Sequence, residues 1–261
     1  MITQEDIFAN KIFLNSVLPL VKVVIESKEN IKKKFKGINA IVQISAKNTN
    51  EKVGIHFLID DGEWTVVKGV TEGPTIELEF KSIPEFNAFF SGKSKKLPKI
   101  KGWYNVKLLI NTLKALTTMG NLLKLTSPPD DEEEKELFVK LYFYLLSSGI
   151  SQLNKAGHPD VSKWAKKSPE RVYAWVVDGK PEISAYIKVK SGKTKAVRGI
   201  YKRSKPFFTM RFDSVDSALG ILLERDDMIE STTKGKLIME GGPEYGTQLG
   251  EFMILVGSYA K

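Results

Sequence analysis

The sequence predicts an α+β fold in two similar halves, each with a mostly antiparallel sheet and helices packed on one face. In each half, alternating apolar runs flank a pair of turn residues, Asp61-Gly62 in the first and Ser191-Gly192 in the second. Such pairs are typical of β-hairpins. A long apolar stretch precedes each hairpin and an amphipathic stretch follows it. Because this order occurs twice, we expect a duplicated domain.

The first half is expected to begin with a long helix over about residues 4–36 and to continue with a strand meander. Apolar and polar residues alternate along the expected strands, and Gly or Asp stands where turns are needed. The strands that this pattern predicts are 40–45, 53–59, 64–70 and 75–80.

A short helix is expected directly after the fourth strand. Ser82 stands at the N-cap position, with Pro84 in the first turn and Glu85 three residues after the serine, a pattern typical of a helix start. Gly92 is a typical stop. One face of this helix carries Phe86, Phe89 and Phe90. Such an aromatic stripe indicates either a part of the hydrophobic core or one wall of a ligand cavity.

The first half ends with a short strand at about 99–102 and an amphipathic helix. The apolar residues of this helix recur at helical spacing in one wide stripe: Val106, Leu109, Ile110, Leu113, Leu116 and Met119. We expect this stripe to face the interior.

The second half repeats the scheme. Its expected elements are a helix over 135–155, strands at 172–177, 183–189 and 195–200, a short helix from Asp213 and a final helix over 245–259. Between the halves, a proline pair and an acidic run at 126–134 indicate a linker or a helix start. We therefore expect domains at 1–128 and 129–261.

The composition is that of a folded protein, with 42% hydrophobic and 27% charged residues. The sequence has no cysteine, which excludes disulfides and favours a reducing compartment, so we expect a cytoplasmic protein. The N-terminus does not have the pattern of a secretory signal. The apolar run from Ile12 to Ile25 has only 14 residues, too few to cross a bilayer, so we expect a buried helix.

The charge is unevenly distributed. Residues 1–128 hold 19 lysines against 12 acidic residues, whereas residues 129–261 hold 21 basic against 19 acidic residues. A basic half is typical of proteins that bind nucleic acid, anionic membrane or a phosphate-bearing ligand, and equally of a solvated lysine-rich surface. The first half has no arginine, the residue best suited to base and phosphate recognition, which disfavours nucleic acid.

Three stretches resemble the sterol carrier protein type 2 (SCP2) family: Phe57 to Val66, Ile76 to Lys93, and Lys99-Ile100-Lys101-Gly102. That family's pattern is a glycine hairpin followed by an aromatic residue, a strand, a short helix that ends in a small-Gly-Lys turn, and a strand of the form Lys-Ile-x-Gly. The stretch from Gly235 to Gly241 is similar to the last of these strands.

The resemblance covers most of residues 37–119 and, more weakly, 170–260. It implies tandem SCP2-like domains, each with an apolar tunnel that takes fatty acids, acyl-CoAs, sterols or phospholipids. The second copy departs from the pattern: Leu222-Leu223-Glu224-Arg225 replaces the small-Gly-Lys turn, and Thr194 stands where the first copy has Trp64. The first copy is therefore the one expected to hold the ligand.

Residues suited to catalysis are sparse. The two histidines are far apart: His56 falls in an alternating strand and His158 precedes a proline, so both are expected to be structural. The sequence contains no nucleophile elbow, zinc-binding helix motif or phosphate-cradling glycine loop. We therefore expect no enzymatic activity, no metal and no cofactor.

These observations predict a non-catalytic protein that binds or transfers a lipid-like molecule. The expected ligand wall is Phe86, Phe89, Phe90, Leu109, Ile110, Leu113, Leu116 and Met119. Lysines after the short helix are expected at the mouth, where they favour an anionic membrane or head group: Lys93, Lys95, Lys96 and Lys99. A carboxylate at Leu113 is expected to abolish uptake. An accessory module of a larger complex and a basic nucleic-acid or anionic-surface binder are the alternatives.

Overall fold

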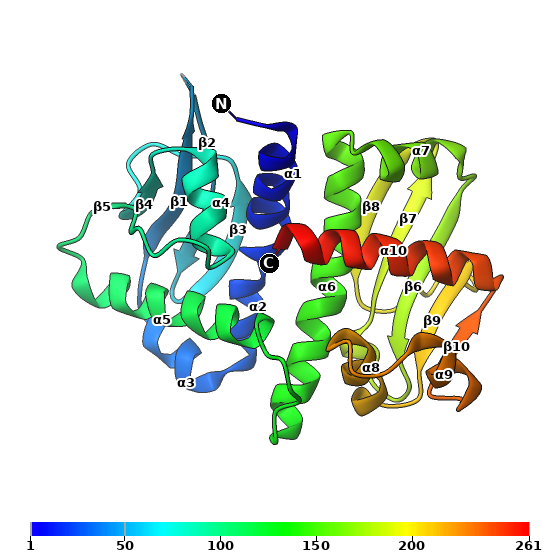
Figure 1. The fold of residues 1–261 in the computed structure, drawn as a ribbon. Helices are drawn as coiled ribbons and strands as arrows, with labels where there is room; N and C mark the ends of the chain where they lie inside the picture. Colours follow the sequence, from blue (N-terminus) through cyan, green and yellow to red (C-terminus); the bar gives the residue numbers. More distant parts are fainter. Residues whose placement is uncertain (1, 50, 261) are drawn as a thin grey trace. The chain divides into compact units, whose positions relative to one another are not determined.

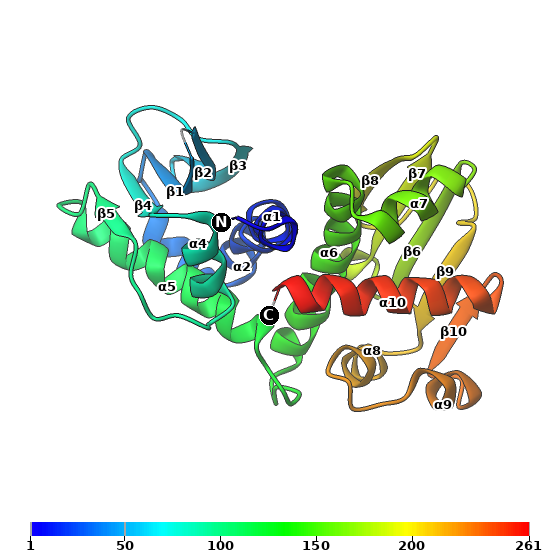
Figure 2. The same cartoon turned by 45° about the horizontal axis from the view of Figure 1, so that its top comes forward.

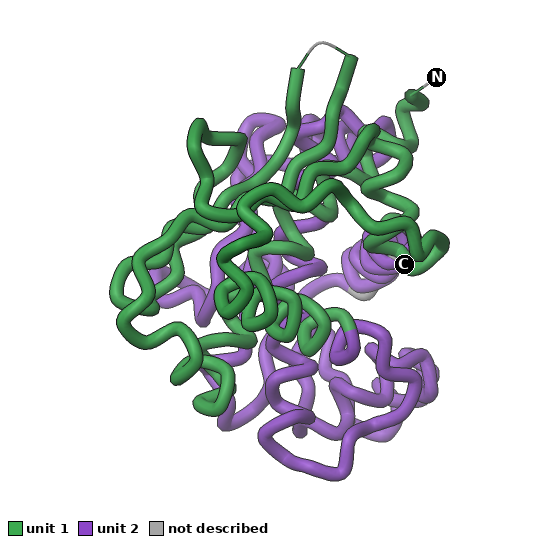
Figure 3. Tube along the Cα trace, turned by 90° about the vertical axis from the view of Figure 1, so that its left-hand side faces the viewer, with its two compact units in different colours: residues 1–120, 259–261 green, residues 121–258 purple. Residues whose placement is uncertain are grey.

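The computed structural model describes residues 2–49 and 51–260 and divides into two compact units. Unit 1 comprises residues 1–120 and 259–261, and unit 2 comprises residues 121–258 (Figure 3). The boundary expected between residues 128 and 129 falls within unit 2, just before its first helix.

Unit 1 is built on a five-stranded sheet in the order β3-β2-β1-β4-β5 (Figure 1). Its strands are β1 (Ala40–Asn48), β2 (Glu51–Asp60), β3 (Glu63–Lys68), β4 (Ile76–Phe80) and β5 (Lys99–Lys101). β1 and β4 run parallel, and the other neighbours run antiparallel. Asp61 and Gly62 join β2 to β3 with φ angles of 46° and 85°, as the expected two-residue hairpin turn requires.

The helices of unit 1 cover one face of this sheet (Figure 2). They are α1 (Gln4–Ile12), the π-helix η1 (Phe13–Val17), α2 (Leu20–Ser27), α3 (Glu29–Lys32), the 3-10 helix η2 (Lys33–Phe35), α4 (Ile83–Phe90) and α5 (Val106–Leu123). The helical run continues from Gln4 to Ser27 and ends there because the backbone at Lys28 is extended, so the expectation of one long helix over residues 4–36 is wrong beyond Ser27. Pro19 cannot donate a helical hydrogen bond, and the turn before it is widened, so that the Leu18 N–H donates to the Phe13 carbonyl.

Among the described residues, one helical run, Gln4–Ser27, is long and apolar enough to cross a membrane by length and composition alone. It has 24 residues, and its most apolar window of 18 residues has a mean hydropathy of 1.5. However, 67% of its most apolar window is buried within the protein, as in the core helix of a globular domain. This burial agrees with the interior position expected for the run from Ile12 to Ile25.

The two faces of the unit 1 sheet differ in chemistry. The face toward the helices is apolar and buried: Val42, Ile44 and Ala46 in β1, Ile55, Phe57 and Ile59 in β2, and Ile76, Leu78 and Phe80 in β4. The opposite face carries polar residues that are also buried, among them Gln43, Ser45 and Glu77. The hydrophobic core therefore lies between sheet and helices, and a polar cluster lies on the other side.

Unit 2 repeats the sheet topology, in the order β10-β9-β6-β7-β8. Its strands are β6 (Arg171–Val177), β7 (Ala185–Lys190), β8 (Lys193–Arg198), β9 (Phe208–Phe212) and β10 (Leu237–Glu240). Only β6 and β9 pair in parallel among the strands described in this sheet. The strands that contain Phe57 and Ile187 thus hold the same place in each sheet, and the predicted α+β class is confirmed.

The helices of unit 2 are α6 (Glu132–Ala156), α7 (Pro159–Lys167), the 3-10 helix η3 (Pro181–Ile183), α8 (Val215–Leu222), α9 (Met228–Thr233) and α10 (Pro243–Ala260). The acidic run after the proline pair begins α6: the Asp131 side chain accepts a hydrogen bond of 2.8 Å from the Glu134 N–H. Gly149 lets α10 approach α6 closely, because a Cβ there would lie 2.5 Å from a methyl group of Val256.

Candidate functional site

The phenylalanines expected to wall a cavity instead pack against one another. Phe86 is fully buried, and its ring lies 4.7 Å from that of Phe90, 5.2 Å from Phe80 and 6.2 Å from Phe13, measured between centroids. The ring of Phe89 lies 5.2 Å from that of Phe80. The aromatic stripe of α4 therefore contributes to the core, which was one of its two interpretations.

The expected apolar stripe of α5 is divided between two faces. Met119 is buried, Leu109 and Leu116 are half-buried, and Ile110 and Leu113 are 58% and 39% exposed. The prediction that Ile110 and Leu113 lie in one interior wall with Phe86 is therefore wrong. The helix is apolar around much of its circumference, so its spacing did not reveal which residues point inward.

This exposure also changes the expected consequence of an aspartate at Leu113. A carboxylate at a site that is 39% exposed remains hydrated. We expect Leu113→Asp to change the free energy of unfolding by less than about 1 kcal/mol, which urea denaturation would measure.

Three of the four lysines expected at a pocket mouth lie between α4 and β5 and the fourth begins β5; all four are exposed: Lys93, Lys95, Lys96 and Lys99. The Lys96 ammonium donates to Glu85 on α4 at 2.6 Å, and this hydrogen bond lowers the pKa of Glu85. The two pockets described below are lined by other residues than these lysines and the eight residues of the expected ligand wall.

A buried carboxylate stands at the centre of the polar face of unit 1. Glu77 Oε1 accepts hydrogen bonds from Ser45 at 2.6 Å, Gln43 at 2.9 Å and Lys52 at 3.0 Å. Glu77 Oε2 accepts one from Lys101 at 2.8 Å, and the same ammonium donates to Glu79 at 2.7 Å. A pocket of about 760 Å³ opens beside this cluster.

These contacts determine the ionisation of Glu77. Burial by itself raises the pKa of a carboxyl group, but the hydrogen bonds, first that from Lys101, outweigh burial and lower the pKa of Glu77 to about 2. The carboxylate is therefore ionised at neutral pH, and both of its oxygens are already occupied. This chemistry suits a structural ion cluster rather than a general acid or base.

The histidines occupy structural positions. His56 is buried in β2, and its Nδ1 lies 3.0 Å from the Gly69 carbonyl oxygen. His158 is buried at the start of α7. Within residues 2–49 and 51–260, the structure contains no cluster of His, Asp and Glu that would hold a metal ion.

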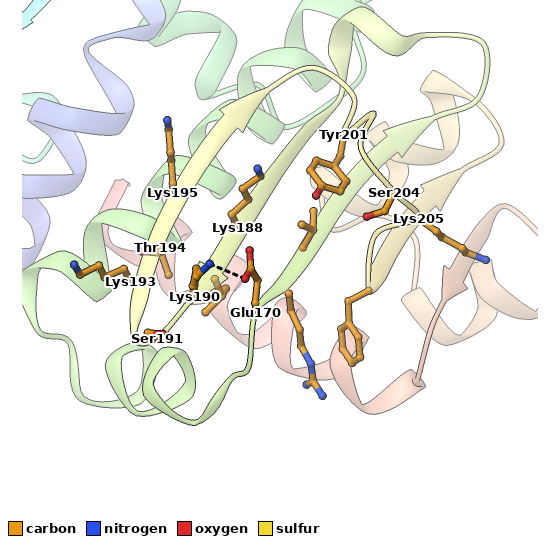
Figure 4. A pocket seen from close by; sticks show the side chains of 14 residues that line it. Glu170, Lys188, Lys190, Ser191, Lys193, Thr194, Lys195, Tyr201, Ser204 and Lys205 are labelled. Carbon is orange, nitrogen blue, oxygen red and sulfur yellow. Dashed lines mark ion pairs between the residues drawn. The ribbon is translucent and has the colours of Figure 1, made fainter.

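The other pocket is a groove in unit 2 with a volume of about 840 Å³. Its lining comes from the start of β6, the β7-β8 hairpin and the segment that leads to β9 (Figure 4). Six lining residues are basic: Arg171, Lys188, Lys190, Lys193, Lys195 and Lys205. The lining includes one acidic residue, Glu170, and two aromatic residues, Tyr201 and Phe207. We call this pocket the basic groove.

Two cations of the lining each lie against an aromatic ring. The Arg171 guanidinium stands 3.7 Å from the centroid of the Phe207 ring, and the Lys188 ammonium stands 5.1 Å from that of Tyr201, both within cation–π range. Glu170 pairs with Lys190 at 2.9 Å, which lowers the pKa of this carboxyl group. The groove thus keeps a large excess of positive charge beside apolar surface.

Most of this charge is not neutralised within the protein. No described carboxylate forms an ion pair with Lys188, Lys193 or Lys195, and Lys205 has only a contact of 3.8 Å with Glu240. The arrangement is suited to a negatively charged ligand that also offers apolar or ring surface.

The basic groove was not predicted from the sequence. The sequence pattern that could have indicated it is the alternation of lysines. They recur at every second residue on either side of the turn, Lys188 and Lys190 in β7 and Lys193 and Lys195 in β8. The net charge of the second half gave no indication of these lysines. Acidic residues elsewhere in that half, such as those at 130–134, offset their positive charge.

No family model and no curated protein matches the sequence. A conserved hypothetical protein from Thermus thermophilus, described as a possible sterol carrier protein, is a structural match with 16% identity and a TM-score of 0.30. The match covers 44% of this chain and 85% of that one. The stereoselective inverting sec-alkylsulfatase Pisa1 from Pseudomonas sp. and a double mutant of it match at 13% identity, with TM-scores of 0.26 and 0.27. These matches cover 57% of this chain but only 28% of the sulfatase.

Proposed function

We propose that this protein is a non-catalytic binding protein for an anionic, lipid-like molecule, and that the basic groove of unit 2 receives it. One observation carries the proposal: the hairpin lysines Lys188, Lys190, Lys193 and Lys195 share one face of β7 and β8 and line a groove beside Tyr201. An amphipathic anion has the matching chemistry, an acidic head group joined to an apolar body.

The size and lining of the groove support this reading. Its volume of about 840 Å³ lies within the range of about 300–1,000 Å³ that is usual for small-molecule sites. The half-buried rings of Tyr201 and Phe207 offer apolar contact, and each buried CH₂ of a ligand contributes about 0.8 kcal/mol. The ammonium groups of Lys188 and Lys195, which are cross-strand partners on one face of the hairpin, are suited to a carboxylate or phosphate, because each can donate charge-assisted hydrogen bonds.

Binding without catalysis accords with the ionisation of the nearby groups. Glu170 is engaged by Lys190, and the pKa of its carboxyl group is lowered, so that it is ionised at neutral pH. A general acid needs a pKa near the working pH. The resemblance of the first half to the SCP2 family also favours a carrier of lipid-like molecules.

The test is the displacement of a fluorescent fatty acid from the full-length protein by unlabelled fatty acid and by lysophospholipid. We expect the double variant Lys188→Gln, Lys195→Gln to weaken binding about 10- to 30-fold, because each lost charged contact costs about 1 kcal/mol. The control is Lys163→Gln, Lys167→Gln on α7. It removes the same charge from exposed positions outside the groove and should bind within about twofold of wild type.

Equal binding by the groove variant and the wild type would refute the assignment of the site. A second candidate is nucleic-acid binding, which the cation–π pairs of Arg171 and Lys188 also favour, because bases stack on aromatic rings beside basic residues. A single-stranded oligonucleotide that displaces the fatty acid more effectively than lysophospholipid does would favour this candidate.

A further inference from the structure

A band of exposed apolar side chains lies at the start of α5 and in the turn before it. Trp103 is 68% exposed, Tyr104 73%, Val106 52%, Ile110 58% and Leu113 39%. We call these five residues the α5 band. Residues 106, 110 and 113 recur at helical spacing and therefore share one face of the helix, which is labelled in Figure 1.

The fold of unit 1 does not require this band. The opposite face of α5 is the one that packs inward, through Leu108, Ala115, Met119 and Leu122, all of them buried. Exposed apolar patches that combine aromatic and aliphatic residues mark surfaces that meet another apolar phase. The band is therefore available to contact something outside unit 1.

The charge around the band indicates what that contact is. Residues 86–129 contain eight lysines and no aspartate or glutamate. Lys107 and Lys114 are exposed on α5 beside the band, and the proximity of the Lys114 ammonium lowers the pKa of Lys34, so a further basic residue lies close to this face. An apolar strip on a helix that carries lysines and no acidic residue is complementary to a surface that is apolar inside and anionic outside.

We propose that the α5 band docks on an anionic lipid bilayer, with Trp103 and Tyr104 at the head-group level and Val106, Ile110 and Leu113 toward the acyl chains. Trp and Tyr favour this interface, and amphipathic helices with lysines beside the apolar face lie in its plane. Nucleic acid would leave the aliphatic residues without a partner. This docking surface is in unit 1, and the inference does not depend on the basic groove.

The tryptophans make the proposal directly measurable. Of the four, Trp64, Trp164 and Trp175 are buried, so Trp103 is the one that solvent quenchers and lipid can reach in the folded protein. With vesicles of phosphatidylcholine and phosphatidylglycerol at low salt, we expect a blue shift of the emission and protection from acrylamide. Trp103→Phe should abolish both signals while the protein still co-sediments with the vesicles.

The decisive comparison uses two exposed isoleucines. Ile110→Asp should lower co-sedimentation with anionic vesicles at least tenfold. Ile254→Asp, which introduces the same charge at a position of α10 that is 73% exposed, should bind as wild type does. Circular dichroism melting checks that both variants are folded.

Equal vesicle binding by the two variants would overturn the proposal. Equal binding of the wild type to neutral and anionic vesicles would also overturn it, and so would the absence of wild-type binding. A wild-type dimer that Ile110→Asp dissociates, without vesicle binding, would identify a second copy as the occupant and overturn it too.

Discussion

Replacing Glu77 by glutamine is expected to lower the free energy of unfolding of unit 1 by about 3 kcal/mol at pH 7. The pKa of this carboxyl group falls from 4.5 to about 2 because hydrogen bonds from Lys101, Ser45, Lys52 and Gln43 outweigh its burial. The folded state therefore stabilises the ionised form, and the neutral amide of glutamine cannot replace it. Urea denaturation followed by hydrogen exchange of the β1 and β4 amides would report unit 1 separately.

The same shift predicts how the effect depends on pH. Since the folded-state pKa is lower than the ordinary value of 4.5, the stabilisation is fully present above pH 4.5 and is lost as the pH falls toward 2. The difference between wild type and Glu77→Gln should therefore shrink over this window. Glu72→Gln, at an exposed position, is the control and should change the free energy of unfolding by less than about 0.5 kcal/mol. A difference that stays constant from pH 7 to pH 2 would contradict the role assigned to the Glu77 carboxylate.

Gly102→Ala is expected to destabilise unit 1 by about 4 kcal/mol. Gly102 has a φ of 70°, which costs an L-residue about 1 kcal/mol, and a Cβ at this position would lie 2.0 Å from the Thr75 carbonyl oxygen. The obstacle is backbone, which cannot move without disturbing the β4-β5 pairing that orders Lys101 against Glu77.

Gly37→Ala is the matched control for Gly102→Ala. Gly37 has a similar φ of 72°, but nothing lies within 4 Å of the Cβ position. Its replacement should cost only the backbone term of about 1 kcal/mol. Chemical denaturation of both variants separates steric overlap from backbone strain, and equal losses of stability would show that the contact with Thr75 is relieved at little cost.

Local signals predicted much of the fold. The Ser82 side chain accepts a hydrogen bond from the Glu85 N–H at 3.3 Å and caps α4, as the sequence pattern indicated. Ser191 and Gly192 have φ angles of 49° and 76°, which agree with the expected hairpin turn. Gly102 ends the Lys-Ile-x-Gly strand that carried the family resemblance, and its contact with Thr75 explains why a glycine is needed there. The cap and the turn depend on interactions between residues close in sequence, whereas the need for Gly102 comes from a contact 27 residues away along the chain.

Tertiary packing decided the rest. α5 is apolar around most of its circumference, so only the surrounding structure decides that Met119 faces inward and Ile110 outward. The basic groove forms where the β7-β8 hairpin meets Arg171 and Phe207, two residues far apart in the sequence whose side chains contact each other in the fold. The sequence by itself thus determined the α+β class, the turns and the helix starts, because their physics is local. The exposed band and the groove depend on which surfaces remain uncovered after the chain has folded, and that is a property of the whole structure.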